Sequence, residues 1–266
     1  MDTLNRLGMQ SRLATTTAVL WALLALIACD KREPARAAPL ASNVETREWR
    51  TPGCDAEERC TSVVIKREVF AERPALNDAV RVQLLEQLQG NGEAPGSTAS
   101  NFEQVAKAFI ADAAEASEIS SAAWQLTGDA KKLALHDNLL TVAISSYIYS
   151  GGAHGMPVTH WLNWDLAENR QVALADVIAP GAEERFWSLA QTAHKQWMEA
   201  QEVDVDFREN WPFVRSDDFR LTDSGLKLLY GVYTLAPYSM GEIELTLPRE
   251  KLTGLLREPY LSEPEN

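Results

Sequence analysis

The stretch from residue 139 to residue 166 constrains the fold of this chain most strongly. Apolar and polar residues alternate from Leu139 to Tyr149 and again from Val158 to Leu166. A period of two is typical of β-strands that bury one face. The segment between them, SGGAHG at residues 150–155, holds three glycines and needs backbone freedom that other residues lack. The sequence therefore predicts a β-hairpin around a glycine-rich loop.

Helix and strand patterns are interspersed along the rest of the chain. Two segments have strand composition, at residues 62–70 and 243–247. Three others carry apolar stripes with helical spacing, at residues 76–88, 102–113 and 182–200. Asn101 and Gln104 match a helix N-cap and its partner three residues later. We expect a turn at Gly128-Asp129 and a short closing helix over residues 249–256.

Most of the expected strands are joined by short turns, which favours antiparallel pairing. We therefore predict an α+β fold, an antiparallel sheet with packed helices preceded by a smaller α+β unit, and we expect residues 133–256 to form a single sheet. Five segments follow from the composition: a signal peptide at 1–28, a lipidated flexible tether at 29–45, an N-terminal α+β unit at 46–130, a second α+β domain at 131–257, and a loose tail at 258–266.

The N-terminus has the pattern of a secretory signal. Arg6 and Arg12 precede an uncharged, mostly apolar run that ends at Cys29. The run LIAC at residues 26–29 resembles the bacterial lipobox, which implies cleavage before Cys29 and acylation of that residue, with anchoring to a membrane by its lipid. The alternative is an ordinary signal with a chance cysteine. We expect a periplasmic protein, and Asp30 leaves open whether the inner or the outer membrane holds it.

The chain has three cysteines, an odd number. An acylated Cys29 leaves Cys54 and Cys60 as a pair, and an oxidising compartment favours a disulfide between them. A metal site is the alternative, but no histidine or third cysteine lies near them in the sequence.

The net charge of −13 limits the partners of the chain. An acidic surface repels phosphate backbones, so we expect no binding to nucleic acid. The same surface attracts basic proteins.

Several motifs resemble the C-terminal domain of proteins of the RsiV and PdaC type. They are YIYSGGAHG at 147–155, Asn163-x-Asp165, and YTLAPYS with a following glycine at 233–241. The resemblance covers residues 133–256 in order. It implies an envelope-facing recognition module, because one kind of member binds lysozyme and another carries the domain beside a peptidoglycan deacetylase. This chain has no room for that catalytic domain, so we expect a protein that is not an enzyme.

Within this reading, the partner is a lysozyme-like basic protein or peptidoglycan, and no cofactor or metal is expected. Aromatic residues and the glycine loop supply the candidate binding residues, which are Tyr147, Tyr149, Gly151, Gly152, His154, Trp161 and Tyr238. The alternative for the aromatic residues is a second core face covered by the 182–200 helix.

Two other functions stay open at this stage. His154 could act in an envelope hydrolase with a nearby carboxylate, and Asp165 and Asp176 could form a separate pair of carboxylates. Turn and helix capping is the competing interpretation of both aspartates, and His160 fits a packed strand residue better than a ligand. A purely structural lipoprotein is the third possibility.

Overall fold

The structure, a computed structural model, describes residues 40–54, 60–90, 99–117 and 122–261. The expected signal peptide and Cys29 lie outside the described residues. The larger sheet has six strands in the order of the sequence. They are β1 (Ser42–Arg50), β2 (Ser62–Phe70), β3 (Gln125–His136), β4 (Leu139–Tyr149), β5 (Met156–Asp165) and β6 (Arg170–Gln171).

All neighbouring strands of this sheet pair antiparallel except β2 and β3, which are parallel. Two helices, α1 (Pro74–Leu88) and α2 (Phe102–Ala116), connect β2 to β3. Such a crossover returns the chain to the same end of the sheet, so the next strand runs in the same direction. The hairpin predicted around residues 150–155 is confirmed as β4 and β5.

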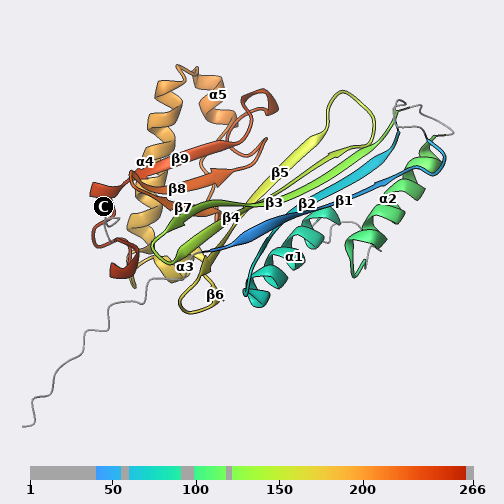
Figure 1. Cartoon of the computed structure of the whole chain (residues 1–266). Coiled ribbons are helices and arrows are strands. Elements are labelled where there is room, and N and C mark those ends of the chain that lie inside the picture. Colours follow the sequence, from blue (N-terminus) through green and yellow to red (C-terminus); the bar gives the residue numbers. More distant parts are fainter. Residues whose placement is uncertain (1–39, 55–59, 91–98, 118–121, 262–266) are drawn as a thin grey trace, which may run out of the picture. The chain divides into compact units, whose positions relative to one another are not determined.

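The helices α1 and α2 cover one face of the six-stranded sheet (Figure 1). Their apolar stripes pack against side chains of alternate strand positions, including Ile65, Leu140, Val142 and Ile144, which are at most 2% exposed. The helix α2 begins as the sequence predicts, because the Asn101 side chain accepts a hydrogen bond from the backbone N–H of Gln104.

Gly128 lies inside β3, and the turn expected at Gly128-Asp129 is therefore wrong. A Cβ atom at Gly128 would lie 3.2 Å from methyl groups of Leu84 and Leu88 on α1. The glycine thus lets the helix approach the sheet closely, which is another reason for a glycine in a strand.

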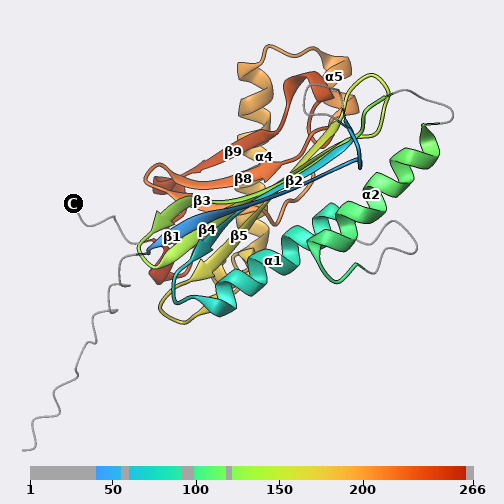
Figure 2. The same ribbon diagram turned by 45° about the vertical axis from the view of Figure 1, so that its right-hand side comes forward.

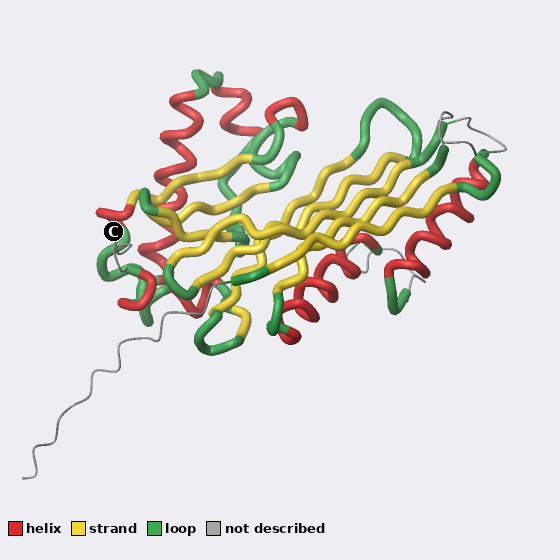
Figure 3. The backbone as a smooth tube through the Cα atoms, viewed as in Figure 1, coloured by secondary structure: helices red, strands yellow, loops and turns green. Residues whose placement is uncertain are grey.

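A second sheet has three antiparallel strands, β7 (Phe219–Thr222), β8 (Gly225–Tyr230) and β9 (Ile243–Pro248). One face packs against α4 (Glu183–Ala200), where Phe186, Leu226 and Leu245 are at most 1% exposed. Leu229, on the other face, packs against Trp161 of β5. The views in Figures 2 and 3 show α4 and the small sheet on the side of the large sheet opposite α1 and α2.

The predicted α+β class is confirmed, but the sheets are organised differently from the prediction. Residues 133–256 do not form a single sheet, because β4–β6 join β1–β3 whereas β7–β9 pair only with one another. The expected boundary at 130/131 falls inside β3, so both sides of it share one sheet. The expected closing helix at 249–256 is only a short 3₁₀ turn at Arg249–Lys251 followed by turns.

Four short helices complete the described elements: α3 (Leu174–Val177), α5 (Val205–Asn210) and two 3₁₀ helices at Tyr238–Met240 and Glu258–Tyr260. The predicted disulfide is confirmed between Cys54 and Cys60, whose Cα atoms are 6.1 Å apart. Among the helices that the structure describes, none has the length and apolar character needed to cross a membrane.

Candidate functional site

The loop at residues 150–155 has a backbone that explains two of its glycines. Gly151 has φ of 96° and Gly152 has φ of 100°, in a region that other residues rarely adopt. Around these positions the loop is exposed. The local sequence therefore produces a protruding turn between β4 and β5 rather than a tight hairpin.

Gly155 has a different reason to be glycine. It is buried, and a Cβ atom there would lie 2.3 Å from the ring carbon Cζ of Tyr147, 2.4 Å from its hydroxyl oxygen and 2.6 Å from the carbonyl oxygen of Ile148. The Tyr147 ring therefore occupies the space that a side chain at 155 would need. This contact fixes the direction in which the loop returns into β5.

The carbonyl oxygen of Gly155 joins the loop to a distant segment of the chain. It accepts a hydrogen bond from Tyr238 Oη at 2.8 Å and lies 3.0 Å from His154 Nδ1. The rings of His154 and Tyr238 also stack, with centroids 4.0 Å apart and planes 22° apart. Tyr238 begins a 3₁₀ turn at Tyr238–Met240, in the connection between β8 and β9.

These contacts determine the hydrogen-bonding character of His154. A carbonyl oxygen only accepts, so Nδ1 carries the proton in this contact and Nε2 of the neutral ring is an acceptor. The hydroxyl of Tyr233 lies 3.5 Å from Nε2 and can donate to it. Tyr233 is 49% exposed and its ring lies 5.6 Å from that of Tyr238.

We call the five rings around this loop the aromatic patch: Tyr147, Tyr149, His154, Tyr233 and Tyr238. Tyr149 donates from its hydroxyl to the carbonyl oxygen of Gly152 at 3.3 Å, so its ring is also bound to the loop. The patch contains apolar ring faces, three tyrosine hydroxyls already bound to the loop, and one exposed imidazole. Such a surface can pack on a ligand and hydrogen-bond to it.

The structure brings most of the predicted binding residues together in or beside the patch. Trp161 is the exception, since its indole is 7% exposed and packs against Ala143 and Leu229. The guanidinium of Arg220 lies over that indole at 5.1 Å. The small sheet therefore covers Trp161, which does not contribute to an exposed surface.

Sequence reasoning missed Tyr233. It lies in the stretch YTLAPYS, five residues before Tyr238. Its backbone has φ of 62°, and the sequence pattern does not predict this conformation. That conformation is uncommon outside glycine and places the ring beside His154. The motif therefore indicated that the segment belongs to the site, but not that Tyr233 contributes its ring to it.

A second histidine, His160 of β5, has a carboxylate partner, which His154 lacks in the described part of the chain. His160 Nδ1 lies 2.8 Å from Asp218 Oδ2, and the other oxygen of Asp218 accepts the backbone N–H of Trp161 at 2.7 Å. The hydrogen bond to Asp218 raises the pKa of His160, although burial opposes the shift. Asp218 lies 58 residues further along the chain, so no local pattern connected the two.

His160 also lines an open groove of about 780 Å³ beside α1. The groove is lined by Ala79, Val82, Gln83, Glu86, Gln87, His160 and Gln171. Sequence analysis treated His160 as a packed strand residue, but about a third of its side chain is exposed.

The two candidate carboxylates, Asp165 and Asp176, accept hydrogen bonds from nearby backbone N–H groups. Asp165 accepts backbone N–H groups of Ala167 and Glu168, both at 2.8 Å, and Asp176 accepts that of Ala173 at 2.9 Å. No carboxylate in the described part of the chain hydrogen-bonds to His154, whose ring contacts are Gly155, Tyr233 and Tyr238. Across the same residues, no three His, Cys, Asp or Glu side chains are grouped so that they could hold a metal ion.

Two family models match consecutive parts of the chain. Residues 55–157 match the model described as "Deacetylase PdaC", and residues 175–250 match the model described as "Protein of unknown function (DUF3298)". Among curated proteins, the chain is similar to the peptidoglycan-N-acetylmuramic acid deacetylase PdaC of Bacillus subtilis, with 20% identity over 147 residues. The match covers 53% of this chain, which spans about a third (31%) of that protein.

Two solved structures resemble the fold along most of its length. A DUF3298 family protein from Pseudomonas aeruginosa has a TM-score of 0.71 and 33% identity, and the match covers 86% of this chain and 99% of that one. A DUF3298 member from Bacteroides fragilis has a TM-score of 0.66, 20% identity and the same coverage, which supports the fold alone.

One expectation from the sequence is corrected by these relationships. The chain was expected not to be an enzyme, but its matches to the PdaC model and to a named deacetylase point to a family that includes enzymes. The sequence argument relied on the length of the chain, which was taken to leave no room for the catalytic domain of the deacetylase. The PdaC part of the stated resemblance is confirmed, whereas lysozyme binding of the RsiV kind stays a prediction.

Proposed function

This chain belongs to the DUF3298 family, and from that premise we propose that its aromatic patch binds the glycan strands of peptidoglycan. The named relative acts on peptidoglycan, which makes the same polymer the natural ligand to test. Tyrosine rings combine an apolar face with a polar tip, a combination that suits the C–H faces and hydroxyl groups of sugars. The Tyr233 hydroxyl can donate to Nε2 of His154, and its oxygen then remains an acceptor for a sugar hydroxyl or amide.

The observation that carries this proposal is the stacking of His154 on Tyr238. His154 lies in the segment matched by the PdaC model and Tyr238 lies in the segment matched by the DUF3298 model. Both segments thus contribute to one exposed surface. A shared surface of this kind is expected where two segments serve a common ligand.

Sedimentation with purified peptidoglycan tests the proposal. Tyr233→Ala removes the most exposed tyrosine of the patch. We expect it to reduce the bound fraction by about tenfold at protein concentrations below the Kd. The reason is that the loss of a well-placed aromatic contact weakens binding by roughly 1–3 kcal/mol. Trp211→Ala is the matched control, because Trp211 is another partly exposed ring and directly follows α5, outside the patch. An unchanged melting temperature in both variants keeps folding out of the comparison.

Acetate release from the same peptidoglycan should be measured alongside binding, because the relationship to a deacetylase makes turnover a separate question. The binding proposal fails if the unmodified chain stays in the supernatant. It also fails if Tyr233→Ala and Trp211→Ala reduce sedimentation equally, since the aromatic patch would then not be the binding surface.

The net charge of −13 favours a second candidate partner, a basic protein of the lysozyme kind. Retention of this chain on immobilised lysozyme at about 20 mM salt and its loss at about 500 mM would support this partner, because screening shortens the range of charge attraction. Absence of retention at low salt excludes it.

We also propose that Cys29 carries the lipid that holds the protein in the cell envelope. The lipobox-like run at residues 26–29 supports this, and Cys29→Ser tests it. The variant should leave the membrane fraction, and the mature unmodified protein should begin at an acylated Cys29 by mass spectrometry. Fractionation of the two membranes decides between inner and outer anchoring, and a mature N-terminus elsewhere contradicts the proposal.

A further inference from the structure

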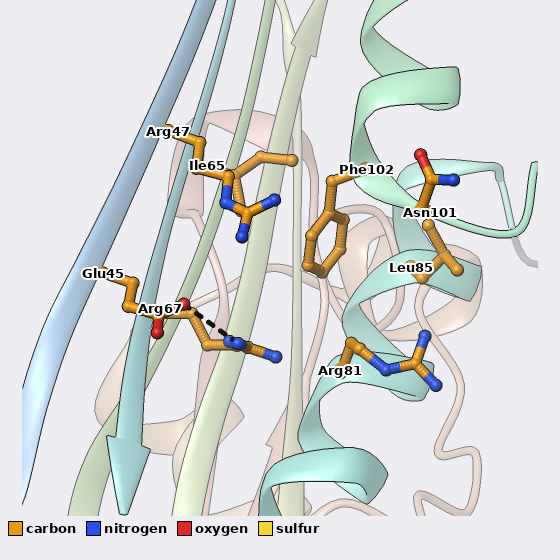
Figure 4. A pocket seen from close by; sticks show the side chains of 8 residues that line it. All are labelled: Glu45, Arg47, Ile65, Arg67, Arg81, Leu85, Asn101 and Phe102. Carbon is orange, nitrogen blue, oxygen red and sulfur yellow. Dashed lines mark hydrogen bonds and ion pairs between the residues drawn. The ribbon is translucent and has the colours of Figure 1, made fainter.

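A small pocket under the helices, at the strands β1 and β2, is lined by three arginines. It has a volume of about 130 Å³ and lies between the strands β1 and β2 and the helices α1 and α2 (Figure 4). Its lining consists of Glu45, Arg47, Ile65, Arg67, Arg81, Leu85, Asn101 and Phe102. Three arginines around one pocket stand out in a chain whose net charge is −13, although the guanidinium of Arg81 points away from the strands in Figure 4.

The strand register brings two of these arginines to the helix-covered face. Arg47 pairs with Ile65 across β1 and β2, and Glu45 pairs with Arg67. Paired positions point to the same face of a sheet, as do positions two residues apart. Ile65 is 2% exposed and packs beneath the helices, so Arg47 and Arg67 project toward α1 and α2 as well.

The charges of the pocket are only partly balanced. Nη2 of Arg67 donates to the Glu45 carboxylate at 3.1 Å, and Nη2 of Arg81 donates to the Asp78 carboxylate on its own helix at 2.7 Å. Arg47 has no ion pair within the described residues. The charge of Arg47 also acts on Glu103 in the first turn of α2. Each guanidinium has five N–H donors, and only a few of those around this pocket donate to a partner among the described residues.

The rest of the pocket is apolar at its floor and electropositive at one end. Ile65, Leu85 and Phe102 are buried beneath the arginines. Phe102 is the first residue of α2, a helix of 15 residues whose N-terminal end carries a partial positive charge. Figure 4 shows the Phe102 ring between the strands and α1, with the guanidinium groups of Arg47 and Arg67 directed toward it.

We propose that this pocket binds a carboxylate that carries a short aliphatic group, such as the C-terminal carboxylate of a peptide that ends in a small residue. Arginine forks match the two oxygens of a carboxylate, and the apolar floor matches the attached methyl or methylene groups. The limited volume excludes a sugar ring with its substituents. The inference depends on β1, β2, α1 and α2 alone, so it stands or falls independently of the aromatic patch.

Calorimetric titration of the full chain with defined anions tests the inference. The probes are acetate, N-acetylalanine, the methyl ester of N-acetylalanine, and inorganic phosphate. N-acetylalanine should bind, and the ester should not, because the ester keeps the aliphatic group and lacks the charge. Acetate and N-acetylalanine together distinguish a free small carboxylate from a peptide terminus.

Arg47→Gln is the informative variant, because Arg47 has no ion pair to leave behind and lies at the exposed edge of the sheet. We expect it to weaken N-acetylalanine binding by about tenfold, as loss of a charge-assisted contact does. Arg50→Gln is the matched control, because Arg50 lies on the same strand, pairs with Glu48 and does not line the pocket. We expect a change of less than about twofold in the control.

The outcomes separate the inference from general charge attraction. Equal weakening by Arg47→Gln and Arg50→Gln would overturn it, since only bulk charge would then matter. Binding of phosphate in preference to every carboxylate would overturn the assigned ligand class. Absence of binding by acetate and N-acetylalanine to the unmodified chain would overturn the site itself, whatever the result of peptidoglycan sedimentation.

Discussion

At residue 155 the missing side chain decides the local geometry. The Tyr147 ring fills the space that a Cβ atom would need, and the carbonyl of the same glycine receives the hydroxyl of Tyr238. One residue therefore couples β4 to the segment that carries Tyr238. The sequence pattern identified the glycine loop, but only the structure distinguishes Gly155, which is a packing residue, from Gly151 and Gly152, which serve the turn.

Gly155→Ala should destabilise the fold by at least about 2 kcal/mol, because the new methyl group meets the Tyr147 ring and a backbone carbonyl that cannot move cheaply. Chemical denaturation measures the loss. Gly231→Ala is the control, since a Cβ atom there meets nothing nearer than the Thr234 hydroxyl at 3.8 Å. Similar losses in the two variants would show that close packing at 155 is not the cause.

The His160–Asp218 pair predicts a pH dependence of stability. Its hydrogen bond raises the pKa of folded His160, and Asp218 and Glu242 are the acidic groups that act on it. Folding therefore favours protonated His160, and this stabilisation is complete below the unfolded pKa of about 6.5 and disappears as the pH rises through the folded pKa. His160→Gln should lose about 1 kcal/mol more of its unfolding free energy at pH 5 than at pH 8, a value reduced for solvent screening because the pair is partly exposed.

Denaturation of the variant and the parent at the two pH values measures this difference. Asp218→Asn should show the same dependence on pH, because it removes the charge that favours protonated His160. A loss that is equal at pH 5 and pH 8 would contradict the assignment of the hydrogen bond to the charged form.

Among the elements, the helices and strands were predictable where one face is buried. The apolar stripes of α1 and α2 reflect one buried face on each helix. In β4 the alternating apolar positions lie under these helices, but Leu139 and Ala143 on the other face are buried as well. Pairing partners were not predictable, because the parallel contact of β2 with β3 depends on where two intervening helices pack. For the same reason Gly128 was interpreted as a turn, although α1 lies against it.

The N-terminus of α2 tests a local prediction that the structure confirms. Asn101 accepts from the Gln104 N–H at 3.0 Å, and Gln104 in turn accepts from the backbone N–H of Ser100 at 2.8 Å. Asn101→Ala should lower the free energy of unfolding by about 1 kcal/mol, because one N–H at the helix end loses its acceptor. Asn101→Asp keeps an acceptor and should stay within about 0.5 kcal/mol of the parent. Equal losses in denaturation would show that the cap contributes nothing.

On the scale of the whole molecule, the large sheet connects segments that sequence analysis had separated. The two histidines of interest both lie at or near β5, yet their partners, Tyr238 and Asp218, come from beyond α4. Neither juxtaposition has a local signal, because each requires the small sheet to fold back onto the large one. The candidate residues around the glycine loop were predictable as a group, and the geometry that joins them was not.

A fragment of residues 131–261 should fail to fold by itself. It would keep β4 and β5 but lose α1, α2, β1, β2 and half of β3, so the apolar face of the hairpin would be exposed to water. Four side chains on that face, Leu140, Val142, Ile144 and Leu162, are at most 1% exposed in the complete fold. At about 1.5–3 kcal/mol for each such side chain, the loss is roughly 6–12 kcal/mol, comparable to the whole stability of a typical domain.

Near-ultraviolet circular dichroism and a two-dimensional amide NMR spectrum of the fragment measure this directly, with residues 40–261 as the matched control. The control should melt cooperatively and give dispersed amide signals, because it retains both sheets and all the helices that cover them. The fragment should give collapsed signals and no cooperative transition, since β4 would lack both its β3 partner along half its length and the helix layer over its apolar face. A dispersed spectrum from residues 131–261 would mean that the small sheet and α4 alone are sufficient to hold the hairpin, and that the six-stranded sheet is not one cooperative unit.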